Sequence, residues 1–91
     1  MTATIAEQWI EQGVEQGRQQ GLERGLEQGL ERGRREGLLK GIALGLELRF
    51  GETGGRLLPE ISTIEEVARL EAIHDALRTV DDLEALRQLY Q

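Results

Sequence analysis

The 91-residue chain has no cysteine, a single proline and one residue each of Phe, Trp and Tyr. The absence of cysteine excludes disulfide frameworks, thiolate zinc sites and cysteine nucleophiles, and it favours a cytoplasmic location. So few aromatic rings leave little for stacking bases or lining a cofactor pocket. No apolar run reaches transmembrane length, and no basic segment followed by an apolar run resembles a signal peptide. We therefore expect a soluble, cytoplasmic chain that builds one small core at most.

Basic charge is also scarce, because the formal net charge is −6. Residues 1–50 contain seven Lys and Arg against eight Asp and Glu, whereas residues 51–91 contain four against nine. Contacts with phosphate need a basic surface, so this balance argues against nucleic-acid binding by the chain alone. The more acidic C-terminal half is the poorer candidate for nucleic-acid binding.

Glycine, in contrast, is abundant and regularly spaced. Nine of the 12 glycines recur every four residues between positions 13 and 45 and form what we call the glycine row. The residue after each glycine is usually apolar, and these residues form the apolar row. The next two positions are usually Glu followed by Gln or Arg. Ile5 and Trp9 extend the glycine row backwards, so the repeat begins near residue 5.

A helix is the structure that accommodates this period. A β-strand would alternate every two residues, and a collagen triple helix needs glycine at every third. In an α-helix, residues four apart lie on one face, so the two rows run side by side. Thr4 and Glu7 form a capping-box start, and Gly51, Gly54 and Gly55 end the pattern. The sequence predicts one long helix within residues 1–50.

Such a helix needs a partner. Each interior glycine costs roughly 0.8–1 kcal/mol relative to Ala, so nine cost about 7–9 kcal/mol, comparable with the stability of a whole small domain. Glycines at this spacing let two helix backbones approach closely, and the polar faces place the contact in water. We therefore expect self-association as a dimer or higher oligomer. The predicted interface comprises Ile5, Trp9, Gly13, Gly17, Gly21, Leu22, Gly25, Leu26, Gly29, Leu30, Gly33, Gly37, Leu38, Gly41, Ile42 and Gly45.

The period also predicts handedness. A repeat of four lies above 3.6 residues per turn, which favours right-handed crossing. The glycine row drifts about 40° per repeat, so a single right-handed crossing is an alternative to a full-length supercoil. Stoichiometry stays open, as does the choice between parallel and antiparallel helices. The alternative to a helix is a disordered low-complexity segment. The unbroken four-residue register and the apolar residue beside nearly every glycine argue against it.

From residue 38 the helix becomes apolar on nearly every side, because Leu39, Leu44 and Leu48 occupy formerly polar positions. The rest of the chain is the expected cover. The sequence predicts an all-α fold in which a glycine-containing loop over residues 51–61 leads to a two-helix hairpin over residues 62–91. This hairpin is expected to pack on residues 38–50. A piece this small lies near the lower limit for independent folding.

Capping boxes predict where the two hairpin helices begin. The pairs are Ser62 with Glu65, Thr63 with Glu66, and Thr79 with Asp82. The expected buried face of the first hairpin helix is Ile64, Val67, Leu70, Ile73 and Leu77. That of the second is Leu83, Leu86, Leu89 and Tyr90.

No residue set predicts catalysis, a metal or a cofactor. His74 is the single histidine and lacks partner ligands, and the acidic residues near it contain no glycine-turned calcium loop. Ser62 has no nearby histidine to activate it, and the glycine run contains no phosphate-binding GxxxxGK[ST] motif. We expect a protein that is not an enzyme.

The chain resembles the C-terminal region of the Rpn family, which comprises recombination-promoting nucleases or putative transposases. The resemblance covers residues 5–91 and rests on the tandem EQG and ERG tetrads, on LELRFG and on ISTIEEVARLEAIHDALRTVDDLEAL. The connection GETGGRLLPE departs from the tighter loop, with Pro soon after RFG, that the family leads us to expect. The resemblance implies that catalysis in the family belongs to an N-terminal nuclease domain with a PD-(D/E)XK metal site. No such motif occurs here, so no catalytic residue is carried over.

The resemblance implies a non-catalytic homo-oligomerisation module, either a C-terminal part or an internally started short form of an Rpn nuclease. Such a module would assemble with itself and with its full-length parent and, like an antitoxin, inhibit it. The alternative is a DNA-contacting accessory module of a recombination or transposition protein. It would have to gather Arg18, Arg24, Arg32, Arg34, Arg35 and Lys40 on one face, against the interleaved Glu15, Glu23, Glu27 and Glu31.

Overall fold

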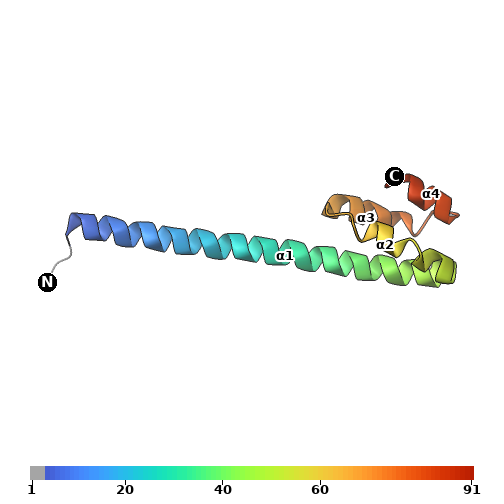
Figure 1. Cartoon of the computed structure of the whole chain (residues 1–91), viewed down its shortest axis with the longest axis horizontal. Helices are drawn as coiled ribbons and strands as arrows, with labels where there is room; N and C mark the ends of the chain where they lie inside the picture. Colours follow the sequence, from blue (N-terminus) through green and yellow to red (C-terminus); the bar gives the residue numbers. More distant parts are fainter. Residues whose placement is uncertain (1–3) are drawn as a thin grey trace. The chain divides into compact units, whose positions relative to one another are not determined.

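The computed structural model describes residues 4–91 as an all-α protein that is 81% helical, with no strand in this described part. Its helices are α1 (Ile5–Gly55), α2 (Leu58–Ile61), α3 (Val67–Ala76) and α4 (Leu83–Gln88) (Figure 1). The predicted all-α fold is confirmed.

The chain divides into two compact units. Residues 4–30 belong to the first, which consists of the N-terminal part of α1. The second unit, Glu31–Gln91, contains the rest of α1 and the three short helices. We call this second unit the C-terminal domain.

The capping box at the start of α1 is confirmed. The backbone N–H of Glu7 donates to the hydroxyl of Thr4 at 3.1 Å, and the backbone N–H of Thr4 donates to the Glu7 carboxylate at 3.3 Å. Each bond satisfies a backbone donor that the first helical turn leaves without a partner.

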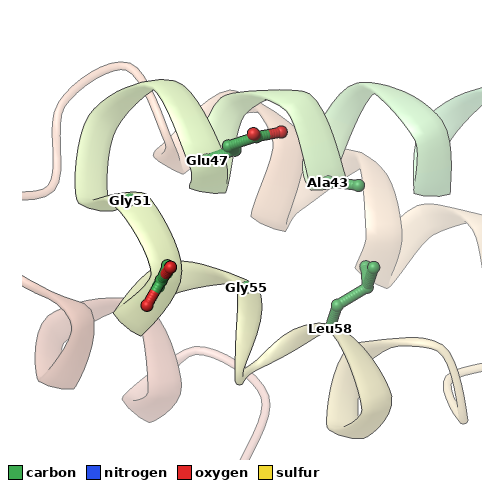
Figure 2. Close-up of a pocket in the computed structure, with 6 residues that line it drawn as sticks. Ala43, Glu47, Gly51, Gly55 and Leu58 are labelled. Atoms are coloured by element: carbon green, nitrogen blue, oxygen red, sulfur yellow. The ribbon is translucent and has the colours of Figure 1, made fainter.

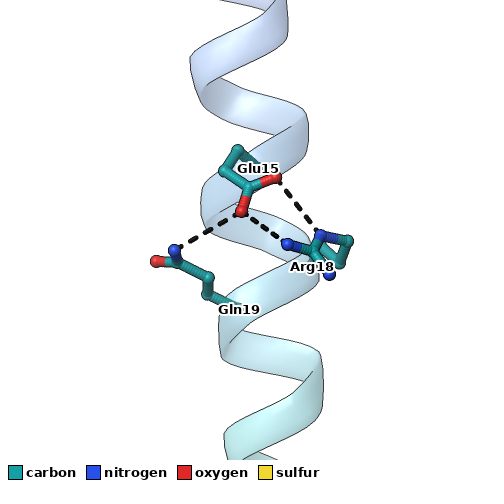
Figure 3. Close-up of polar contacts among 3 residues, drawn as sticks. All are labelled: Glu15, Arg18 and Gln19. Atoms are coloured by element: carbon teal, nitrogen blue, oxygen red, sulfur yellow. Dashed lines mark hydrogen bonds and ion pairs between the residues drawn. The ribbon is translucent and has the colours of Figure 1, made fainter.

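Local side-chain contacts add little to the first unit. Arg18 donates to the two oxygens of the Glu15 carboxylate at 2.7 and 3.2 Å, and the Gln19 amide reaches the same carboxylate at 3.4 Å (Figure 3). Exposed pairs at this spacing contribute only about 0.2–0.5 kcal/mol each. They do not offset the cost of the glycines.

A kink at Gly51 redirects the chain. Gly51 has φ 63° and ψ −145°, and it is the one residue in the described part with a positive φ. The following turn folds closely against α1, because a Cβ at Gly54 would lie 2.5 Å from the carbonyl oxygen of Leu46. Glycine is needed at both positions, at one for conformation and at the other for close approach.

Replacing Gly51 with Ala is expected to destabilise the C-terminal domain by about 1–3 kcal/mol, because residues with a side chain rarely adopt this conformation. Gly55→Ala is the matched control, since a Cβ at Gly55 meets nothing within 4 Å and its φ is not positive. That control should stabilise the helix by up to about 1 kcal/mol. Urea unfolding followed by circular dichroism measures both, and equal effects of the two substitutions would contradict the account.

The core of the C-terminal domain joins all four helices. Ile42 and Leu46 of α1 are fully buried, and around them lie Leu57, Ile61, Ile64, Leu70, Ile73, Leu77 and Leu86. Among the residues predicted for the hairpin core, Ile64, Leu70, Ile73, Leu77 and Leu86 are buried. Leu89 was predicted to be buried and is instead 53% exposed, at the C-cap position just after α4 ends at Gln88.

Helix α3 runs parallel to α1. Its successive contacts advance along both helices in the same direction, from Gly41 with His74 to Gly45 with Leu77. The chain first returns along α1, where Arg35 donates to the carbonyl of Ser62, and then runs forward again as α3. The segment 51–61, predicted as a loop, therefore contains the final turn of α1 and helix α2.

The predicted capping boxes of the C-terminal half are wrong. The hydroxyls of Ser62 and Thr63 donate to the carbonyls of Pro59 and Glu60 at 2.9 and 2.7 Å, so they close α2 and do not open α3. Helix α3 begins after Glu66 without a side-chain cap.

The third pair is wrong by one turn. Asp82, which was expected to be the partner of Thr79 inside the helix, is itself the N-cap of α4. Its carboxylate accepts from the backbone N–H of Ala85 at 2.8 Å.

A polar cluster links α2 to the C-terminal end. The Glu60 carboxylate accepts from Arg87 at 2.7 Å and from the Tyr90 hydroxyl at 2.9 Å. The hydrogen bond from Arg87, followed by that from Tyr90, holds the pKa of Glu60 below its ordinary value. Burial and then the bond to Glu60 raise the pKa of Tyr90 to about 12.

This raised pKa predicts a loss of stability in alkali. Below pH 10 the phenol is neutral in both the folded and unfolded chain, so its contribution is complete. Between pH 10 and about 12 the unfolded chain loses the Tyr90 proton first, so the free energy of unfolding should fall. Urea unfolding at pH 9 and pH 11 should therefore show a larger loss for the native chain than for Tyr90→Phe. Equal losses would contradict the role of Tyr90.

Candidate self-association surface

The first unit exposes an uncovered apolar row. Every residue from 4 to 30 is exposed, including Trp9 at 69% and Leu30 at 75%. The other large apolar side chains exposed there are Ile5, Ile10, Val14, Leu22 and Leu26. An amphipathic helix normally buries such a stripe, so this part of α1 lacks its cover within the described chain.

The glycine row is open from Gly13 to Gly37. A Cβ built on each of seven successive glycines would meet no heavy atom within 4 Å in the described chain. These seven are Gly13, Gly17, Gly21, Gly25, Gly29, Gly33 and Gly37. Packing within the chain therefore does not require glycine at any of them. Their cost of roughly 0.8–1 kcal/mol each is not offset inside one copy.

The last two glycines of the row are covered. A Cβ at Gly41 would lie 3.1 Å from Nε2 of His74, and one at Gly45 would lie 3.0 Å from Cδ1 of Leu77. Helix α3 thus sits on the end of the glycine row at a distance that an alanine would disturb.

This covering corrects the predicted interface at four positions. Ile42 is fully buried in the domain core, Leu38 packs against that core, and Gly41 and Gly45 lie under α3. Ile42 is therefore not accessible to a second copy in this fold, and the other three positions are partly covered. The open part of the predicted interface therefore ends at Gly37. The regular spacing alone does not show which part of the row is covered by the C-terminal helices.

His74 has a packing role in this arrangement. Its half-buried ring lies over Gly41. Within residues 4–91, no group of three or more histidine and acidic side chains is arranged to hold a metal ion.

Two neighbouring arginines of α1, Arg34 and Arg35, connect it to the rest of the C-terminal domain. Arg35 donates from Nε to the carbonyl of Ile64 at 3.1 Å and from a terminal nitrogen to that of Ser62 at 2.7 Å. Arg34 pairs with the carboxylate of Glu71. The guanidinium groups of both arginines thus connect α1 to the segment that follows α2.

Sequence reasoning missed the similar role of Arg49. This residue takes the next glycine-row position after Gly45, and its guanidinium donates to the carbonyls of Leu77 and Val80 at 2.6 and 2.7 Å. It thereby satisfies carbonyls at the C-terminal end of α3. The signal in the sequence is the replacement of glycine by arginine at the point where the repeat stops.

An open pocket of about 500 Å³ lies beside the kink of the C-terminal domain. Figure 2 shows it between the last turns of α1 and the start of α2. Its lining residues are Ala43, Glu47, Gly51, Glu52, Gly55 and Leu58. Two carboxylates and no basic side chain line it, and the sequence did not indicate it.

In the part of the chain that the structure describes, no helix has both the length and the apolar character needed to cross a membrane. Comparisons of the chain with protein-family models, with curated proteins and with solved structures found no match.

Proposed function

We propose that this chain is a non-catalytic module that associates with a second copy of itself through the open glycine row and the neighbouring apolar row of α1. One observation carries this proposal. The same row is open at seven glycines and closed by a packed helix at Gly41 and Gly45. A second copy would supply at the open glycines what α3 supplies at the covered ones.

The energetics support the proposal. An isolated helix with seven uncovered glycines and an apolar row that is exposed as far as Leu30 forgoes both helix propensity and burial. Burying a Leu side chain contributes roughly 1.5–3 kcal/mol, so a contact over Leu22, Leu26 and Leu30 compensates for the glycines. Right-handed crossing belongs to the same proposal, since it follows from the period of four.

The regulatory part of the proposal rests on the resemblance to the Rpn family. The module would be the C-terminal part or a short form of a cytoplasmic Rpn nuclease. By pairing its α1 with that of the full-length protein, it would occupy the surface through which two nucleases assemble. Inhibition follows if the nuclease needs that assembly for activity.

The alternative of a DNA-contacting module has less support. Among its six candidate basic residues, Arg18 pairs with Glu15, Arg34 with Glu71, and Arg35 with backbone carbonyls. Side chains committed to contacts within the chain are less available to phosphate.

Multi-angle light scattering over a concentration series tests the self-association. We expect a dimer or larger assembly at micromolar concentration that dissociates on dilution. A helical monomer across the whole series would overturn the proposal. For the regulatory part, mixing the chain with a full-length Rpn nuclease should yield a mixed complex with reduced DNA cleavage, and unchanged cleavage within a mixed complex would overturn inhibition.

A further inference from the structure

We propose that Gly51 is a hinge at which the C-terminal domain opens, so that residues 52–91 pack on α1 of a second copy instead of on their own. Two copies that exchange these segments form a dimer in which each domain is built from both chains. This inference goes beyond the proposed function, because it concerns the C-terminal domain alone and does not use the open glycine row.

The hinge is a single residue. Gly51, with φ 63° and ψ −145°, is the one residue of α1 whose dihedral angles are not helical (Figure 2). Residues with a side chain rarely adopt a positive φ, whereas glycine adopts both this conformation and the helical one. A rotation at Gly51 alone therefore converts the kinked α1 into a continuous helix. It also carries the segment after the hinge away from the α1 of its own chain.

The segment after the hinge is held together by contacts of its own. Seven of the nine buried core residues of the described chain lie between residues 57 and 86. Glu60 in α2 accepts hydrogen bonds from Arg87 and from the hydroxyl of Tyr90. Arg69 in α3 donates to the carbonyl of Tyr90 at 2.9 Å. These contacts do not involve α1, so the segment keeps them when it moves.

The contacts that hold this segment on α1 all cross the hinge. Each joins a residue before Gly51 to a residue after it, so a second copy supplies the same partner in the same geometry. Exchange therefore retains these contacts and changes the chain mainly at the hinge. The contacts are the pairs Arg34 with Glu71, Gly41 with His74 and Gly45 with Leu77, together with the bonds from Arg35 and Arg49 to backbone carbonyls.

Two glycines keep the chain folded back on itself. Gly51 supplies the positive φ, and Gly54 lets the chain approach α1 so closely that an added Cβ would lie 2.5 Å from the carbonyl oxygen of Leu46. A side chain at either position penalises the folded-back form but fits a continuous helix. Only residues 52–56 connect the hinge to the core residue Leu57, and short connections under strain favour exchange between copies.

A disulfide between two chains reports which copy supplies α3. The Cβ of Leu77 lies 3.9 Å from a Cβ built on Gly45, which matches the Cβ separation of about 3.5–4.5 Å in disulfides. The chain has no cysteine, so one chain carries Gly45→Cys alone and an isotope-labelled chain carries Leu77→Cys alone. The two are mixed in a glutathione redox buffer, and mass spectrometry identifies the mixed disulfide. In monomers that are folded back, these two cysteines cannot meet, so the disulfide requires exchange.

The substitutions Gly51→Ala and, separately, Gly54→Ala are placed in both chains of the mixture. We expect each to raise the yield of the 45–77 disulfide, measured below saturation, at least about 30-fold, because the dimer relieves the strain in two copies at once. Gly55→Ala is the matched control. A Cβ at Gly55 meets nothing within 4 Å and its φ is not positive, so this substitution should leave the yield unchanged.

Three results would overturn the hinge. The first is a yield for both Gly51→Ala and Gly54→Ala that stays at the level of Gly55→Ala, whether these chains are folded or unfolded by circular dichroism. The second is an equal increase when Gly45→Cys is mixed with Ala72→Cys, whose position on α3 is exposed, since unfolded chains would cross-link in this way. The third is the absence of an internal disulfide in a chain that carries both Gly45→Cys and Leu77→Cys.

The outcome is separate from that of the proposed function. Light scattering of the native chain tests association through the glycine row, whereas the 45–77 disulfide reports only on the exchange of α3. A native monomer that exchanges after Gly51→Ala would overturn the glycine-row association and support the hinge. A native dimer without the mixed disulfide in either variant would do the reverse.

Discussion

A chain in which Gly21, Gly25, Gly29 and Gly33 are replaced by Leu is expected to be monomeric at concentrations at which the native chain is assembled. Side chains at these positions would hold two backbones apart, and overpacking at a close contact typically costs 1–3 kcal/mol per site. Since about 1.4 kcal/mol is a factor of ten, the dissociation constant should rise at least about 100-fold. Multi-angle light scattering measures this change.

The same variant should be a better helix. Each Gly→Leu change recovers roughly 0.8 kcal/mol of helix propensity, and no heavy atom of the described chain obstructs the added Cβ. Circular dichroism should therefore show equal or greater helix content and a higher melting temperature for residues 5–30. Loss of assembly together with loss of helix would point to misfolding and contradict the explanation.

A matched control places four leucines on the opposite side of α1. Gln19, Glu23, Glu27 and Glu31 each lie two positions after a glycine, which is about 200° around the helix. Their replacement by Leu adds the same side chains away from the glycine row. This control should remain at least as associated as the native chain. A monomeric control would show that the position of the added side chains is immaterial.

Leu70→Ala is expected to lower the free energy of unfolding of the C-terminal domain by about 2–5 kcal/mol. Leu70 lies in α3, is fully buried and belongs to the cluster with Ile42 and Leu46. The loss combines the transfer free energy of the removed atoms with the cavity they leave. For a domain of this size, such a loss approaches its whole stability. Urea unfolding followed by circular dichroism measures this loss.

Leu89→Ala removes the same atoms from an exposed position. Because 53% of the Leu89 surface is exposed, this substitution should lower the free energy of unfolding by less than about 1 kcal/mol. Comparable losses at Leu70 and Leu89 would mean that α3 does not pack on α1 as described.

Periodicity predicted the long helix because it is a local property. The four-residue spacing fixes which side chains share a face, and Thr4 with Glu7 marks the start through a contact between residues three apart. The glycines after Phe50 were predicted to end the helix; α1 instead kinks at Gly51, whose positive φ favours glycine, and continues to Gly55.

The C-terminal capping boxes failed because a hydroxyl has more than one possible partner. Spacing offered Ser62 and Thr63 a helix ahead of them, but their hydroxyls bond to carbonyls behind them, at the end of α2. The overlooked signal was Pro59, which favours the first turn of a helix and opens α2.

The extent of the open glycine row was not predictable from spacing for a related reason. Gly37 and Gly41 each follow a charged residue and precede an apolar one, yet one is open and the other lies under His74. What distinguishes them is the segment that returns after Gly51: the sequence predicted that it packs on residues 38–50, but the spacing does not show which glycines it covers. Arg35 and Arg49, which hold the returning segment by its carbonyls, looked like ordinary surface charges for the same reason.

The equivalence of the seven open glycines has a consequence for how this chain tolerates changes in length. Because none of them contacts another part of the described chain, deleting one tetrad between residues 13 and 30 removes one open glycine and leaves both rows continuous. An insertion of one tetrad extends the rows in the same way. Changes of one, two or three residues would instead shift every later side chain to another face. We therefore expect the N-terminal part of α1 to tolerate changes in length of four residues at a time, while the C-terminal domain keeps its fold.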